Sequence, residues 1–263
     1  MEVTKNMKSI FFMLVSLVLY GCATRENGFE YVDLALPSGN LWAACNVGAQ
    51  SVLDGGEYFA WGETQPSAWD GFVVGDEYSV DWSSYKYFTP DSGQSKYNFD
   101  TQSKYYDGLF VLDSCDDAAT VNMGGKWVTP SLQDYIELST ECQVSFATNY
   151  KASGISGELF VSKHNGKSIF FPEGCLWTSE LERDLYVFYG LDGKKVIEKR
   201  FDAALTSCGI GLYRCQTLHV RGIIAGKNRD ELVLDSLDQR MIEMINEGDT
   251  SICDRNHAVS CIP

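Results

Sequence analysis

Short runs of alternating apolar and polar residues dominate the chain, and this period predicts strands more often than helices. Residues 31–34 and 57–61 have strand composition, and turn signals rich in proline, glycine and aspartate lie at 37–39 and 54–56. Later in the chain the pattern predicts strands at 159–162, 168–171, 185–191 and 217–225. The Asn165-Gly166 pair predicts a hairpin turn between the first two of these strands.

Two short helices are predicted in the middle of the chain. The first runs through residues 116–119, with Asp113 or Ser114 as its N-cap. Ser131 can cap the second, and Asp134 stands at the capping-box position. The residues that share one face of this second helix are Tyr135, Leu138 and Cys142.

The order of these elements is strands, two helices and then many strands, which predicts an α+β fold with a mostly antiparallel sheet. Residues 65–108 are rich in serine, aspartate, glycine and aromatic residues and show little period, so we expect a long loop held by its rings. Residues 226–263 differ, because Leu234, Leu237, Met241, Ile242 and Ile245 have helical spacing. We expect a C-terminal helix and a cysteine-containing tail there.

The N-terminus has the three parts of a secretory signal peptide. Lys5 and Lys8 precede an apolar run at 10–20, and Gly21 and Cys22 follow it. The run is shorter than the roughly 20 residues that a membrane-spanning helix needs. A cysteine after a small residue resembles the bacterial lipobox, which implies cleavage before Cys22 and lipid on its sulfur. The alternatives are an ordinary signal peptide with a chance cysteine, or an uncleaved anchor.

Composition indicates an acidic, folded domain. Removing residues 1–21 leaves 242 residues, which suits one domain with an appendage. The chain is 44% hydrophobic, and the mature part has 19 basic and 35 acidic residues, for a net charge near −16. Such a surface repels phosphate backbones and anionic lipid heads, which argues against nucleic-acid binding. We therefore expect the lipid on Cys22 to be the membrane attachment.

Eight cysteines remain when Cys22 is lipidated, and an even number in an exported chain favours disulfides. Two pairs are close in sequence, and each could close a short loop: Cys208 with Cys215, and Cys253 with Cys261. His257 lies between the last two cysteines and could make a zinc site with them, but a fourth ligand is missing and a disulfide is favoured.

Three early segments carry a family resemblance: residues 31–39 (YVDLALPSG), 41–49 (LWAACNVGA) and 57–64 (EYFAWGET). They resemble the Fibrobacter succinogenes major paralogous domain, which is abundant in exported proteins and lipoproteins of Bacteroides-type bacteria. Further matches follow in order at 85–87, 96–98, 116–119, 125–131, 168–172, 176–179 and 220–221. The resemblance covers about residues 30–225, which leaves 22–29 as a lipidated tether and 226–263 as an extension.

The resemblance implies a C-type-lectin-like fold, related to that of formylglycine-generating enzymes, on an exported protein of the outer membrane. It implies no general activity. Because ligands generally meet the late loops and strands of such folds, it points to five residues: Trp177, Glu180, Glu182, Arg183 and Arg214. The other interpretation is a buried tryptophan with solvated charges.

The aromatic-rich loop offers a second candidate site. Sugars bind by laying their CH faces on rings while carboxylates and amides take the hydroxyls, and Trp69 and Trp82 both stand among polar residues. The alternative, which we favour for most of these rings, is that they fix the loop to the core. Asp116-Asp117 could bind calcium, although consecutive acids at a helix start more often cap it. We expect no metal and no cofactor.

Three functions remain open. The favoured one is a non-catalytic, lectin-like envelope protein that binds an extracellular glycan or protein. The second is a structural or assembly component of the envelope without a small ligand. The third is an oxidase of the formylglycine-generating type using Cys208 and Cys215, although their spacing differs from that family's copper-binding cysteines. No nucleophile motif surrounds the three histidines, His164, His219 and His257, so we expect no enzyme.

Overall fold

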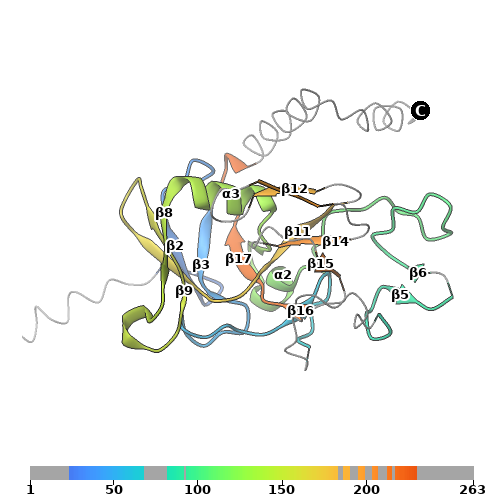
Figure 1. Cartoon of the computed structure of the whole chain (residues 1–263), viewed down its shortest axis with the longest axis horizontal. Coiled ribbons are helices and arrows are strands. Elements are labelled where there is room, and N and C mark those ends of the chain that lie inside the picture. The colour runs from blue at the N-terminus through green and yellow to red at the C-terminus, as the bar shows by residue number, and fades with distance from the viewer. Residues whose placement is uncertain are drawn as a thin grey trace, which may run out of the picture.

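The computed structural model describes residues 24–67, 82–91, 93–182, 186–189, 195–198, 203–206, 212–214 and 217–229 (Figure 1). It is an α+β fold built of mostly antiparallel sheet with two α-helices, as the sequence predicts. In the described residues no helix is long and apolar enough to cross a membrane. The predicted signal peptide, Cys22 and the predicted C-terminal helix lie outside these residues.

The largest sheet joins the two ends of the described chain. Its five strands are β1 (Arg25–Glu26), β2 (Phe29–Asp33), β3 (Leu41–Asn46), β17 (Arg221–Ile224) and β7 (Trp127–Val128), in that order across the sheet. All neighbours are antiparallel, and Trp42 in β3 stands opposite Ile223 in β17. Strand β1 lies within residues 22–29, the expected tether. It forms a strand because the Asn27-Gly28 turn folds it back onto β2.

A second antiparallel sheet has the order β10 (Ser168–Pro172), β9 (Gly157–Ser162) and β8 (Cys142–Ala147). The predicted hairpin turn joins β9 to β10, with Gly166 at a φ of 72°. A single-turn 3-10 helix, η1 (Tyr150–Ala152), lies in the β8–β9 connection.

Smaller sheets complete the fold. They are β4 (Phe59–Ala60) with β16 (Thr217–Leu218), β5 (Phe88–Thr89) with β6 (Gly93–Gln94), β12 (Tyr186–Tyr189) with β13 (Lys195–Glu198), and β11 (Trp177–Glu182) with β14 (Ala203–Thr206) and β15 (Leu212–Tyr213). The strand predicted at 217–225 is therefore two strands. Strand β16 pairs with β4, and strand β17 pairs with β3. Between the two strands, the Val220 carbonyl accepts a hydrogen bond from the Val47 amide.

The first helix, α2 (Ala118–Met123), begins later than predicted. Its N-cap is Asp117, whose carboxylate accepts from the amides of Ala119 and Thr120, and not Asp113 or Ser114. The reason is that Asp113 and Asp116 are held outside the helix by Lys96. The helix ends at Gly124, where φ is 66°, as the glycine pair indicates.

The second helix, α3 (Leu132–Glu141), confirms the predicted capping box. Ser131 accepts from the Asp134 amide, and the Asp134 carboxylate accepts from the Ser131 amide. Tyr135 and Leu138 are buried on its inner face, as predicted, whereas Cys142, also buried, lies beyond the helix as the first residue of β8. The helix contacts β8 and β9 on one side and β11 on the other (Figure 1).

Two apolar clusters form the core. One gathers Trp61, Trp127 and Trp177 with the tyrosines of the aromatic-rich loop. The other lies beneath α3 around Trp42, where the Tyr135 ring centroid is 5.3 Å from that of Trp42. Arg221 is fully buried beside this second cluster, with its guanidinium 4.2 Å from the centre of the Phe171 ring and hydrogen-bonded to backbone carbonyls.

Candidate functional site: a groove beside helix α3

The structure does not bring the sequence-predicted site residues together on one open surface. Trp177 is 1% exposed, and its indole donates to the Phe59 carbonyl at 2.8 Å. Arg214 is completely buried and donates to the Tyr97 carbonyl at 2.9 Å. Both therefore serve the core. Glu180 is half-buried in β11, bridged to Val111, and Arg183 lies outside the described residues.

The aromatic-rich loop is held down by its rings, in line with the interpretation we favoured. Tyr85, Tyr87 and Tyr97 are all buried. Trp82 is half-buried, with its ring centroid 5.8 Å from that of Tyr85, so it keeps part of its surface open. Trp69 lies outside the described residues, and a sugar-binding role for these two tryptophans stays a prediction.

Asp116 is the residue that fixes this loop. Its carboxylate accepts from the hydroxyls of Tyr87 and Tyr97, the latter at 2.8 Å, and pairs with Lys96 at 2.6 Å and Lys86 at 3.2 Å. Burial works to raise the pKa of Asp116, but the hydrogen bonds from Lys96 and the two tyrosines prevail and lower it to about 2.

Asp116 also belongs to the Asp116-Asp117 pair for which calcium binding was the alternative. Asp113, Cys115 and Asp116 lie within 4.8 Å of one another. The ammonium of Lys96 pairs with both aspartates, so a lysine already supplies the positive charge there. Asp117 caps α2 and also accepts from the amide and hydroxyl of Thr129, which agrees with the capping interpretation.

The predicted disulfide residues Cys208, Cys215, Cys253 and Cys261 lie outside the described residues. Cys175 is disulfide-bonded. The remaining described cysteines, Cys45, Cys115 and Cys142, carry free thiols. The pairings that we expect from sequence spacing therefore stay predictions.

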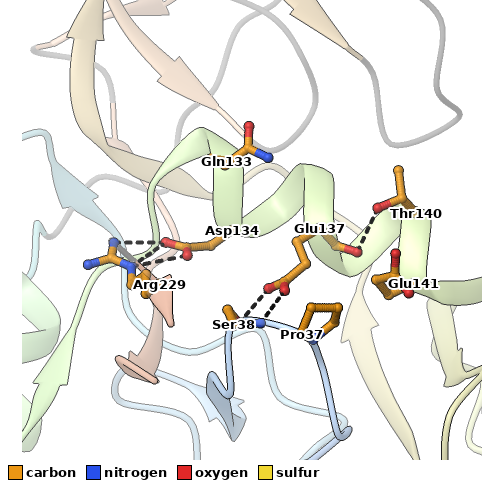
Figure 2. Close-up of a pocket in the computed structure, with 8 residues that line it drawn as sticks. All are labelled: Pro37, Ser38, Gln133, Asp134, Glu137, Thr140, Glu141 and Arg229. Carbon is orange, nitrogen blue, oxygen red and sulfur yellow. Dashed lines mark hydrogen bonds and ion pairs between the residues drawn. The ribbon is translucent and has the colours of Figure 1, made fainter. Parts of the chain in front are cut away.

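The most site-like feature of the described surface is a groove that runs along α3 (Figure 2). Its volume is about 160 Å³. Five lining residues come from α3 and three from segments far away in sequence: Gln133, Asp134, Glu137, Thr140 and Glu141 from the helix, and Pro37, Ser38 and Arg229 from the opposite wall. Three carboxylates and one guanidinium give the groove an acidic character.

The opposite wall is a tight turn that the sequence makes easy to form. Pro37 and Ser38 precede Gly39, which has a φ of 76° and donates its amide to the Leu36 carbonyl at 2.9 Å. Gly226 packs directly against this turn, where any side chain would collide with the Ser38 carbonyl. The two glycines therefore allow the 37–40 turn and the segment after β17 to meet beside α3.

Asp134 is a buried carboxylate whose charge is balanced. The Arg229 guanidinium reaches it with Nη2 at 2.8 Å from Oδ2 and Nε at 3.1 Å from Oδ1. Asn40 donates to the same carboxylate at 2.8 Å, and Ser131 donates from both its amide and its hydroxyl. This side chain thus fastens the start of α3 to both segments of the opposite wall, and Figure 2 shows its contact with Arg229.

Glu137, one turn further along α3, is buried without such a balance. Its carboxylate accepts from the Ser38 amide at 2.7 Å and from the Ser38 hydroxyl at 2.6 Å. Only 9% of the residue is exposed, and in the described part of the chain it pairs with no cation. Desolvation raises the pKa of Glu137, against the two hydrogen bonds from Ser38.

Glu141 forms the far end of the groove. Its Oε2 lies 2.7 Å from Nε2 of His164 in the β9–β10 turn, and its side chain is 32% exposed. His219, by contrast, is buried away from the groove, with its ring centroid 4.1 Å from that of Tyr58, and burial lowers its pKa. His257 lies outside the described residues.

Sequence reasoning missed the groove. Ser131 and Asp134 were recognised as a cap, and residues 37–39 as a turn, but nothing local showed that the turn packs on α3. One signal was available: Glu137 lies beside Leu138 on the side of α3 that faces the core, where an acid needs a partner. The chain matches no protein-family model, and no curated protein or solved structure matches it.

Proposed function

We propose that this protein is a lipid-anchored component of the bacterial outer membrane whose C-type-lectin-like domain binds an extracellular glycan or protein without catalysis. The groove along α3 carries the proposal. It holds two buried carboxylates, Asp134 and Glu137, in positions fixed by hydrogen bonds to the opposite wall. Groups that are fixed before a ligand arrives lose little freedom on binding, which favours recognition.

Two features of the sequence support the rest of the proposal. The apolar run that ends at Gly21-Cys22 favours export and lipid attachment. The resemblance to the major paralogous domain favours a lectin-like fold, and the mixed α+β architecture is compatible with it. Strand β1 begins at Arg25, only a few residues after Cys22, so a ligand would be met near the membrane.

Anchoring is tested by metabolic labelling with an alkyne fatty acid. Cells expressing the protein are expected to incorporate the label, and cells expressing Cys22→Ser are expected not to. Equal labelling of both would contradict lipid attachment at Cys22.

Ligand binding through the groove is tested by photo-crosslinking in intact cells. A benzoylphenylalanine at Thr140, which is exposed and lines the groove, is expected to capture one discrete partner. The same group at Gln102, exposed on the aromatic-rich loop, is the matched control. Adducts from both sites alike, or from neither site together with no hit on a glycan array, would refute the proposal.

A further inference from the structure

The groove contains two buried carboxylates that differ in one respect. Asp134 and Glu137 are three residues apart on α3, so their side chains point the same way. They are 2% and 9% exposed, respectively. Asp134 has the guanidinium of Arg229 beside it, whereas Glu137 has only the neutral donors of Ser38. Of the two buried carboxylates, Asp134 therefore has a positively charged partner, and Glu137 has none among the described residues.

An unmatched buried charge is costly, because it loses hydration without gaining an opposite charge. Hydrogen bonds from Ser38 reduce this cost but add no positive charge. Glu137 also lines the groove, so a ligand group that enters the groove from solvent can approach the Glu137 side chain (Figure 2). This combination favours a ligand that brings a cation.

The cation is better an organic group than a metal ion. Among the described residues, the sole set of three side chains close enough to share one ion is Asp113, Cys115 and Asp116, away from the groove. The groove carboxylates are thus too spread for a single ion of the calcium type, which takes 6–8 oxygen ligands. A volume of about 160 Å³ far exceeds the roughly 10–15 Å³ that one water needs.

A sugar fits this groove less well than a basic side chain. Its lining contains no aromatic ring on which a sugar face could lie, and Pro37 is its main apolar residue. The groove already binds one guanidinium, because Arg229 donates to the Asp134 carboxylate through two nitrogens. The formal net charge of −15 further favours approach of a basic partner.

We propose that the groove along α3 is a docking site for a lysine or arginine side chain of a partner protein, which pairs with Glu137 as Arg229 pairs with Asp134. Glu141 at the rim adds attraction and guides the side chain inward. This inference rests on the proposed binding function and narrows it to a protein ligand.

The test is calorimetric titration of the full chain, purified in detergent, with a pentalysine peptide. Wild type is expected to bind it, and Glu137→Gln to lose at least tenfold in affinity. Glu141→Gln, at a partly exposed position where folding is not at risk, is expected to lose about threefold. Glu173→Gln removes the same charge from an exposed site away from the groove and is expected to change affinity less than twofold.

The controls separate this inference from the broader proposal. Equal losses in Glu137→Gln and Glu173→Gln would show diffuse attraction and overturn the docking site. Unchanged affinity in both groove variants would do the same. A glycan-array signal that Glu137→Gln abolishes would replace the basic side chain by a sugar while leaving the binding function in place. Spermidine that competes fully with pentalysine at equal charge would identify a free polyamine as the ligand instead.

Discussion

Glu137 and Ser38 are joined by two hydrogen bonds, from the Ser38 amide at 2.7 Å and the Ser38 hydroxyl at 2.6 Å. They lie 99 positions apart, and the pair closes a turn of the N-terminal region onto helix α3. A carboxylate held in this way cannot rotate freely, yet it has no cation beside it among the described residues. Its charge is therefore available to a partner.

The pKa of Glu137 predicts how stability varies with pH. Because the pKa is raised in the folded state, the folded protein holds this proton more tightly than the unfolded chain. The resulting stabilisation is fully present below the unfolded value near 4.5 and is lost as pH rises through the folded value. Urea unfolding between pH 4 and 7 should show this decline in wild type and a weaker one in Glu137→Gln. Parallel curves for the two proteins would count against it.

Asp116 is predicted to hold the aromatic-rich loop. Asp116→Asn removes the charge that pairs with Lys96 and Lys86 and should cost about 1.5–3 kcal/mol, because it weakens charge-assisted hydrogen bonds to a buried carboxylate while both lysines keep access to solvent. Trypsin should then cut sooner at exposed Lys104. Asp113→Asn, which also loses a contact to Lys96 but at a half-exposed site, is the matched control and should cost about 1 kcal/mol or less. Similar losses in both variants would contradict the special role of Asp116.

The acid limb of stability should also depend on Asp116. Its pKa is lowered to about 2, so its contribution is present above the unfolded value of 3.8 and is lost as pH falls through about 2. Acid titration followed by tryptophan fluorescence should show a shallower loss in Asp116→Asn than in wild type. An identical acid transition in the two proteins would remove Asp116 from this account.

Substitution of two tryptophans predicted as ligand contacts should lower the stability of the protein by different amounts. Trp177→Ala removes a fully buried ring and should lower the free energy of unfolding by about 3–5 kcal/mol. Trp82→Ala removes a half-buried ring and should cost clearly less. Thermal unfolding measures both changes, and a glycan array run beside it tests the sugar interpretation of Trp82. A Trp177→Ala protein as stable as wild type would contradict the core role.

Cysteine reactivity should follow exposure and pKa. Cys115 is exposed and should react first with iodoacetamide at pH 8. Cys45 and Cys142 should be slower, because burial raises the pKa of both, that of Cys142 to about 11. Cys175 should stay unmodified until a reductant is added. Mass spectrometry of peptides reads the order, and immediate labelling of Cys175 without reductant would contradict its disulfide.

Local signals in the sequence were sufficient for much of the fold. The Ser131 and Asp134 capping box and the Asn165-Gly166 turn depend on residues a few positions apart, and both are present. The predicted N-cap of α2 was wrong because a distant residue decides it. Lys96 pairs with Asp113 and Asp116 and holds both outside the helix. Strand β8 (Cys142–Ala147) was missed although its sequence, CQVSFA, alternates apolar and polar residues, because Cys142 was assigned to the face of the preceding helix.

The groove could not be predicted, because each of its decisive contacts joins distant segments. Arg229 was read as part of an extension, yet it pairs with Asp134 in the cap of α3. Trp177 and Arg214 were chosen from late strands that carry ligands in lectin-like folds. Here those strands close the core, and their large side chains turn inward onto backbone carbonyls.

The Ser38 amide offers the most direct test of the groove, because its proton is donated to Glu137. In an amide-detected NMR titration of the isotope-labelled full chain with pentalysine, the Ser38 resonance should shift in a saturable way. The shift should vanish in Glu137→Gln and persist in Glu173→Gln. A Ser38 resonance that stays fixed while amides elsewhere on the acidic surface move would contradict docking at the groove.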